Sequence, residues 1–313
     1  MSNNISTDCH NSTQVDIIPV CMYCFIFIVG LIFNVLALVF FFSQTKSRSH
    51  TIVYMTNLAL ADVLLILTLP MRIYYHLGYE GLPQRLCEIV GLILKANMYG
   101  SIFLLTCICF DRCMAVTFPM STRVKEGRKK APLVCLGIWI FTFGASLPIY
   151  LSKQEKVQCQ CFDSLPIYSI TPVIAYTTLF VGFGIPLLIM LICSWGLVRA
   201  VRKSSVAQTN LVDSRKIQRM IATSILIFLL SFLPYHATLV FLSRYKENIT
   251  CRMRAAYSYS LILACLNTVL DPIAYYFTTD TFRSTLDMGA VWRMLPLNSQ
   301  SSDLNNRSRA PNG

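Results

Sequence analysis

One long apolar run, from Cys87 to Pro119, limits the folds open to this chain. It reads CEIVGLILKANMYGSIFLLTCICFDRCMAVTFP, with a cysteine at one end and Asp-Arg near the other. At about 1.5 Å per helical residue, the stretch from Cys87 to Arg112 spans roughly 37 Å, enough to cross a bilayer with some tilt. Lys95, Asn97 and Ser101 interrupt it, and polar groups at that depth are costly unless they face a partner or a wet cavity. The run predicts a membrane-spanning helix with polar groups at three depths.

Six more runs of spanning length bring the expected total to seven. Hydrophobic residues make up 55% of the 313, and charged residues only 13%, about half of what a soluble domain carries. We therefore expect an all-α membrane protein, a seven-transmembrane helix bundle, rather than a soluble domain with a large core. The expected spans are 17–42, 52–77, 86–117, 131–151, 170–200, 216–243 and 255–277.

The loops between these runs predict how the chain is oriented. Residues 1–16 are polar, lack the basic patch and apolar core of a cleavable signal, and carry glycosylation sequons at Asn4 and Asn11; a third sequon, at Asn248, lies in the last outer loop. With the N-terminus extracellular, most of the basic residues behind the net charge of +12 fall on the cytoplasmic side. This asymmetry predicts a multi-pass plasma-membrane protein, and it explains the charge without a nucleic-acid partner.

Four segments follow from this reading. Residues 1–16 are the extracellular tail and 17–278 the seven-span bundle. Residues 279–288 can form a short amphipathic eighth helix on the inner leaflet, because Phe282 and Leu286 lie four apart. The Ser-, Asn- and Arg-rich stretch 289–313 is expected to be a disordered cytoplasmic tail.

The polar residues inside the spans follow an order that resembles the rhodopsin-like (class A) G-protein-coupled receptors, over nearly the whole chain. The residues that carry the resemblance are Asn34, Asn57-Leu-Ala-Leu-Ala-Asp62, Asp111-Arg112-Cys113, Trp139, Pro186, Ser231-Phe-Leu-Pro-Tyr-His236 and Asp271-Pro-Ile-Ala-Tyr275. Phe232, Cys113 and the Asp-Pro of the last motif depart from the commonest pattern. They resemble the branch of nucleotide (purinergic) and lysophospholipid receptors, whereas Ser194 replaces a tyrosine that usually meets the switch arginine.

The resemblance implies a receptor rather than an enzyme, with a heterotrimeric G protein as partner and the membrane as its lipid environment. The residues it assigns to coupling and switching are Asp111, Arg112, Phe232, Pro234 and Tyr275. Arg112 is expected to be held by its neighbour Asp111 until activation. A non-signalling seven-span scavenger of the same fold is the alternative.

The resemblance also implies an allosteric sodium ion, with no other cofactor. Its expected ligands surround Asp62 near the middle of the membrane, and they are Asp62, Asn97, Ser101, Asn267 and Asp271. Two carboxylates this close repel unless a cation lies between them. The alternative is a protonated Asp62 in a water-bridged network without an ion.

Two disulfides follow from the same resemblance. Cys87 is expected to pair with the second outer loop, where Cys161 fits the branch better than Cys159, although both are available. Cys9 with Cys251 would tie the N-terminal tail to the last outer loop.

The outer ends of the spans predict an anion-binding site. Arg72 and Lys95 lie within spans, where a cation is by default a functional candidate, and Arg244 is expected at the same level. An anionic small molecule or lipid would meet these cations. The resemblance puts a lysophospholipid or related lipid first; a nucleotide or small carboxylic acid is the alternative. The expected ligand-binding residues are Arg72, Lys95, Met98, Tyr99, His236, Arg244 and Tyr257.

Overall fold

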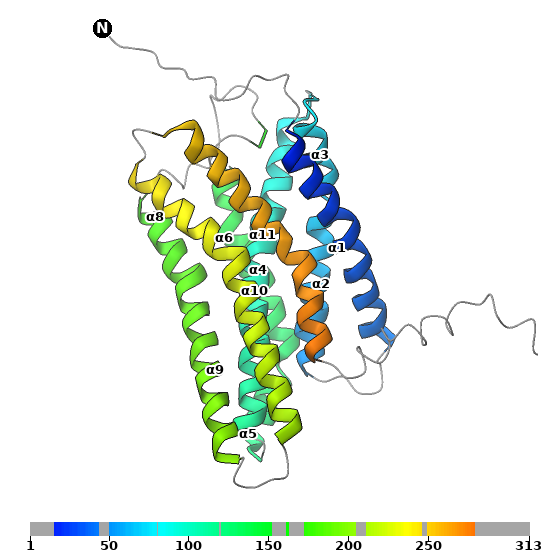
Figure 1. The fold of residues 1–313 in the computed structure, drawn as a ribbon, viewed down its shortest axis with the longest axis vertical. Helices are drawn as coiled ribbons and strands as arrows, with labels where there is room; N and C mark the ends of the chain where they lie inside the picture. Colours follow the sequence, from blue (N-terminus) through cyan, green and yellow to red (C-terminus); the bar gives the residue numbers. More distant parts are fainter. Residues whose placement is uncertain are drawn as a thin grey trace, which may run out of the picture.

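The computed structural model is a bundle of long helices lying side by side (Figure 1). All the regular structure among the described residues is helical, as the sequence predicts. The structure describes residues 16–43, 50–79, 81–118, 120–151, 161–162, 172–204, 211–245 and 249–278.

The described helices form seven rods. The first, second and third are α1 (Ile17–Ser43), α2 (His50–Ile66) continued by α3 (Leu69–His76), and α4 (Gln84–Thr117). The fourth is α6 (Ala131–Leu151), preceded by the short α5 (Thr122–Arg128). The fifth joins α8 (Pro172–Thr177), a π-helical turn (Thr178–Gly184) and α9 (Ile185–Ser204); α10 (Leu211–Arg244) and α11 (Cys251–Thr278) complete the bundle.

Five of these rods are long and apolar enough to cross a membrane, and a sixth joins them if α5 and α6, bent by 48°, count as one span. α11 has 28 residues and carries several polar side chains among its apolar ones. Its Asn267, Thr268 and Asp271 are fully buried in the bundle. The polarity of α11 therefore belongs to its inward face, where neighbouring helices can satisfy these groups.

The outward faces of the helices are apolar and exposed, as expected for surfaces that meet lipid tails. The exposed residues include Ile28, Val39, Leu133, Ile140, Phe180 and Leu230. Inside, the side chains of Tyr23, Tyr235, Phe228 and Phe232 are almost completely buried and fill the centre of the bundle.

Two breaks in the rods accompany prolines. α2 ends at Ile66 and α3 restarts at Leu69, with Pro70 in its first turn, where its missing N–H costs nothing. The π-helical turn lies directly before Pro186, and the N–H of Ile185 bonds the carbonyl of Phe180, five residues back. Pro234 and Pro272 lie inside α10 and α11. A proline favours a bend because it removes a helix hydrogen bond, but the sequence analysis did not predict the π-helical turn.

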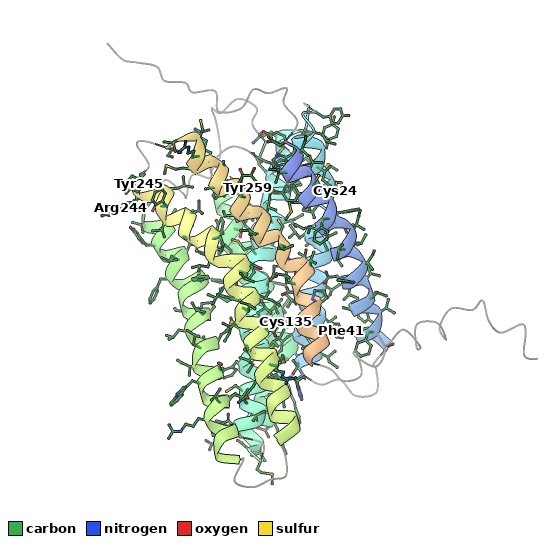
Figure 2. All side chains as sticks on the ribbon, in the orientation of Figure 1. Cys24, Phe41, Cys135, Arg244, Tyr245 and Tyr259 are labelled. Carbon is green, nitrogen blue, oxygen red and sulfur yellow. A yellow bond between two sulfur atoms is a disulfide. The ribbon has the colours of Figure 1, made fainter. Side chains whose placement is uncertain are left out.

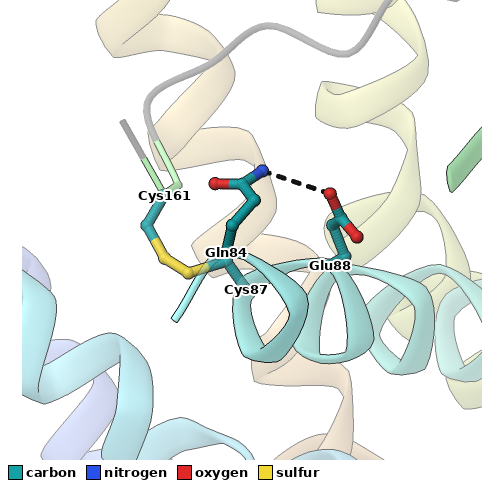
Figure 3. The surroundings of a disulfide bond; sticks show 4 residues. All are labelled: Gln84, Cys87, Glu88 and Cys161. Carbon is teal, nitrogen blue, oxygen red and sulfur yellow. Dashed lines mark hydrogen bonds between the residues drawn. A yellow bond between two sulfur atoms is a disulfide. The ribbon is translucent and has the colours of Figure 1, made fainter. Parts of the chain in front are cut away.

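One disulfide fixes an end of α4, and it confirms the expected partner of Cys87. Cys87 is bonded to Cys161, with 5.5 Å between the Cα atoms and 74 residues between them in the chain (Figure 3). Beside it, Gln84 Nε2 donates a hydrogen bond to Glu88 Oε1 at 3.2 Å. We call this end of the bundle the disulfide end and the opposite one, where α5 lies (Figure 1), the α5 end.

Several predictions concern residues outside the described part of the chain. Cys251 is disulfide-bonded, but its expected partner Cys9 is among these residues, as are Cys159 and the sequons Asn4, Asn11 and Asn248. The helix expected at 279–288, the tail at 289–313 and residues 1–15 of the N-terminal tail are outside as well.

The disulfide leads to a first prediction. Cys87→Ser should lower the free energy of unfolding by about 2–4 kcal/mol, the usual contribution of a native disulfide. Thermal unfolding of purified protein and surface labelling of cells would both show the loss. Cys161→Ser should have the same effect and Cys159→Ser should not; equal effects of all three changes would contradict this assignment.

Candidate functional site

Two basic side chains are buried at the disulfide end, and both lie against aromatic rings. Arg72, on α3, is 4% exposed, and its guanidinium carbon lies 4.5 Å from the ring centroid of Phe162 and 6.0 Å from that of Tyr23. Phe162 follows Cys161, so the disulfide also positions this ring. A cation over an aromatic face recovers part of its lost hydration energy.

Lys95 occupies the middle of the same end of the bundle. Its ammonium donates a hydrogen bond to the Tyr235 hydroxyl and lies 3.9 Å from the Tyr235 ring centroid and 5.9 Å from that of Tyr257. Lys95 is 6% exposed and close enough to Arg72 for the two cations to repel. We call Arg72, Lys95, Phe162, Tyr235 and Tyr257 the cation cluster. An incoming anion would relieve this repulsion.

Aromatic side chains from three rods pack below Lys95. His236 stacks on Phe183 with 4.7 Å between ring centroids and meets Tyr99 edge to face at 6.0 Å. His236 Nδ1 hydrogen-bonds the Phe232 carbonyl at 2.8 Å, while its buried Nε2 has no hydrogen-bond partner among the described residues. Met98 is buried beside them in the core.

Gly182 explains how the fifth rod comes so close to α4. A Cβ atom on this residue would lie 2.7 Å from Cε1 of Tyr99, closer than side chains tolerate. Gly182 belongs to the π-helical turn, so the break in the rod and the missing side chain together let Tyr99 pack against the backbone. Neither feature was singled out from the sequence.

The structure brings most of the predicted ligand-binding residues together but leaves out Arg244. The Arg244 side chain is exposed at the end of α10, beside Tyr245 at the edge of the bundle (Figure 2), whereas Arg72 and Lys95 are buried. Its convergence with them on one anion stays a prediction. Conversely, the sequence analysis missed Tyr235 and Phe162 as partners of the cations. Their positions next to His236 and Cys161 in the chain were the available signals.

A buried acidic group lies at mid-depth, made by α2, α4 and α11. Asn97 Nδ2 donates to Asp62 Oδ1 at 3.3 Å, and Asn267 Nδ2 donates to Asp271 Oδ2 at 2.7 Å. The two carboxyl groups also interact electrostatically with each other. We call Asp62, Asn97, Ser101, Asn267 and Asp271 the acid cluster; none is more than 3% exposed.

Four oxygens of the acid cluster have no hydrogen-bond partner among the described residues: Asp62 Oδ2, Ser101 Oγ, Asn267 Oδ1 and Asp271 Oδ1. A buried polar atom without a partner is costly. Hard cations take oxygen ligands of this kind, so the residues present fit a small cation. The expected set is thus assembled in space.

The α5 end holds a different ion pair from the one expected. Arg128 of α5 donates from Nε to Asp111 Oδ1 at 2.6 Å and from Nη2 to Asp111 Oδ2 at 2.9 Å. The Thr51 hydroxyl of α2 also donates to Oδ2. We call these three residues the Asp111 clamp. Arg112 Nε has no hydrogen-bond partner among the described residues, although Arg112 and Asp111 attract each other electrostatically. The sequence did not predict Arg128 as the hydrogen-bonded partner of Asp111.

The remaining motif residues serve the interior of the bundle. Phe232 is fully buried and meets Phe228 edge to face at 5.5 Å. The carbonyl of Pro234 accepts a hydrogen bond from the Thr238 hydroxyl at 2.7 Å. The helix bond that the proline itself removes is the one to the Leu230 carbonyl. Tyr275 lies on α11, and its side chain is outside the described part.

Two amides connect the rods away from these clusters. Asn34 Nδ2 donates to the Thr268 carbonyl at 2.7 Å, which joins α1 to α11. Trp139 Nε1 donates to Asn57 Oδ1 at 3.0 Å, which joins α6 to α2. The first contact is buried and the second partly buried, and polar contacts between helices of this kind fix helix rotation in a membrane.

Comparison with known proteins agrees with this arrangement. The family described as 7 transmembrane receptor (rhodopsin family) matches residues 33–275. The chain is 32% identical over 283 residues to lysophosphatidic acid receptor 6 of Homo sapiens, covering 86% of this chain and 82% of that protein.

Two other human receptors show similar agreement. Lysophosphatidic acid receptor 4 is 31% identical over 303 residues, covering 93% of this chain and 82% of that protein. Cysteinyl leukotriene receptor 1 is 35% identical over 280 residues, covering 85% of this chain and 82% of that protein.

The contact between Gly182 and Tyr99 leads to a second prediction. Gly182→Ala should destabilise the protein by about 1–3 kcal/mol, as overpacking does, because the new methyl group would overlap the Tyr99 ring. The midpoint of thermal unfolding measures the effect, and adding Tyr99→Leu should recover most of it. Gly137→Ala is the matched control, since nothing lies within 4 Å of a Cβ there; equal losses for Gly137 and Gly182 would argue against the packing explanation.

Proposed function

The chain belongs to the rhodopsin family of seven-transmembrane receptors, signalling proteins rather than enzymes, and we propose that it is a receptor for an anionic lysophospholipid or a related acidic lipid. Membership of this family, together with the apolar helices, indicates a multi-pass plasma-membrane protein. In this proposal, ligand binding at the disulfide end promotes nucleotide exchange on a heterotrimeric G protein at the α5 end.

The observation that carries the proposal is the burial of two cations, Arg72 and Lys95, at one end of the bundle. Burying a charge in a membrane protein is costly, and such residues mark substrate or ligand sites by default. Arg72 offers the planar fork that binds a phosphate or carboxylate in two places, and Lys95 adds a point charge. Both therefore suit an acidic head group.

The surroundings of the two cations support a lipid. Tyr235, Tyr257, Met98 and Tyr99 give the region aromatic and aliphatic walls, all but Tyr99 fully buried. The similar receptors are named for lysophosphatidic acid and for cysteinyl leukotrienes, both acidic lipids. We place a lysophospholipid first because receptors named for it are similar over up to 93% of the chain.

The orientation follows from the disulfide and the charges. A disulfide persists in an oxidising space, which supports an extracellular disulfide end. α5 carries Arg123, Lys125 and Arg128, followed by Lys129 and Lys130, which suits a cytoplasmic loop. The N-terminus would then be extracellular, as the sequence predicts.

A sodium ion is part of the proposal as an allosteric ligand of the acid cluster. Asp62 and Asp271 would supply charge, while Ser101, Asn97 and Asn267 would supply neutral oxygens. Bound there, the ion would screen two buried carboxylates that otherwise repel. The four oxygens without partners are the support for this assignment.

The cation cluster leads to a third prediction. Arg72→Ala and Lys95→Ala should each reduce agonist potency at least about tenfold, or roughly 1.4 kcal/mol, because each removes a cation that would meet the head group. The assay is nucleotide exchange on purified G proteins with lysophosphatidic acid, other lysophospholipids, leukotrienes, nucleotides and small carboxylic acids.

The controls separate this site from general surface charge. Arg254→Ala removes an exposed cation of α11 and should leave potency unchanged. Normal agonist potency in well-folded Arg72→Ala and Lys95→Ala variants would contradict the proposed anion site. Saturable lipid binding without nucleotide exchange on any G protein would favour a non-signalling scavenger.

The acid cluster leads to a fourth prediction. Sodium should weaken agonist binding, and Asp62→Asn should abolish this dependence because it removes one of the two charges. Agonist affinity measured in sodium and in N-methylglucamine at equal ionic strength tests it. A folded Asp62→Asn protein that keeps full sodium sensitivity would contradict the sodium assignment. The control Asn57→Ala, outside the acid cluster, should keep the sodium sensitivity of the wild type.

A further inference from the structure

The Asp111 clamp sets two arginines in competition for one carboxylate. Asp111 is 4% exposed at the α5 end of α4, and both of its oxygens accept hydrogen bonds from Arg128. The Thr51 hydroxyl donates a further hydrogen bond to Asp111 Oδ2. Arg112, the next residue along α4, interacts electrostatically with both Asp111 and Arg128 but has no hydrogen-bond partner for its Nε among the described residues.

The geometry explains why Arg128 holds the carboxylate. Its Nε and Nη2 reach the two oxygens at 2.6 and 2.9 Å, the paired arrangement that makes arginine–carboxylate contacts strong. Arg112 follows Asp111 directly on the helix, where neighbouring side chains point in different directions, so it meets the carboxylate with poorer alignment than Arg128 does. Arg128 approaches from another element and can align both bonds.

The clamp also holds α5 in place. This helix has seven residues, too short to be stable alone in water. Ser121 caps its first turn by accepting a hydrogen bond from the Val124 N–H at 3.4 Å. Arg128 is in its last turn, so the contact with Asp111 fixes the opposite end of the helix to α4 and α2.

We propose that Arg128 is a positioning residue for coupling, which by occupying both oxygens of Asp111 keeps the Arg112 guanidinium available to a G protein. This inference rests on the proposed signalling function. Without Arg128, the buried carboxylate keeps only the hydrogen bond from the Thr51 hydroxyl, and Arg112 is the other cation that interacts with it. Arg112 then pairs with Asp111 and is withdrawn from the G-protein face.

The first test measures basal nucleotide exchange on G protein with purified, monodisperse receptor and no ligand. Arg128→Gln should lower the rate at least about fivefold, the lower end of couplings between sites. Arg128→Lys keeps the positive charge but not the paired N–H donors of the guanidinium, so its exchange rate should lie between those of the wild type and Arg128→Gln. Lys125→Gln, an exposed change on the same helix, should match wild type.

The decisive variant is the double change Asp111→Asn with Arg128→Gln. If Arg128 acts by keeping Asp111 away from Arg112, removing the carboxylate restores exchange to at least the wild-type rate. If Arg128 merely supports α5, the double variant stays as slow as Arg128→Gln or slower, and the proposal is overturned. Unchanged or faster exchange in Arg128→Gln alone would overturn it as well.

A second measurement does not depend on a G protein. The Nε–H signal of Arg112 in ¹⁵N-arginine-labelled receptor, assigned through Arg112→Lys, should shift downfield in Arg128→Gln as it gains a carboxylate acceptor. It should return toward its wild-type position in the double variant. An unshifted signal contradicts the proposal. Absence of exchange by the wild-type receptor on every G protein would count against the proposed function, while the Arg112 signal still decides this inference.

Discussion

The cost of placing polar groups among apolar helices governs this structure. A charged or hydrogen-bonding side chain in the hydrocarbon region is tolerated when it faces another polar group inside the bundle. Asp62, Asp271 and Asn267 are fully buried, whereas apolar residues such as Val39 and Leu133 are exposed on the outside. The rotation of each helix follows, since its polar residues must turn inward to find partners.

α4 shows how this constraint organises function, because it contributes residues to the cation cluster, the acid cluster and the Asp111 clamp. Lys95 belongs to the cation cluster, Asn97 and Ser101 to the acid cluster, and Asp111 to the clamp at the α5 end. The other members of each cluster come from different rods. A change at one depth can therefore bias the packing at another, which is the physical requirement for coupling between two ends.

The aromatic packing between the cation cluster and the acid cluster is dense and specific. His236 lies between Phe183, Tyr99 and Tyr235, and Gly182 allows the Tyr99 ring to contact the backbone of the fifth rod. Close-packed interiors transmit displacement because they have little free volume. The π-helical turn contains Gly182 and Phe183, and Pro234 lies two residues before His236 within α10.

The sequence alone determined the helical class, the approximate spans, the Cys87–Cys161 bridge and the members of the acid cluster. The class and the spans depend on apolar length, which a sequence records directly, whereas the bridge and the acid cluster were implied by the resemblance to the receptor family. Tertiary structure decided which long side chains meet. Lys95 contacts Tyr235 across 140 positions, Asp111 binds Arg128 instead of its neighbour, and Arg244 remains exposed. Sequence spacing fixes depth along a helix, but helix rotation and loop path decide which partner a flexible cation can reach.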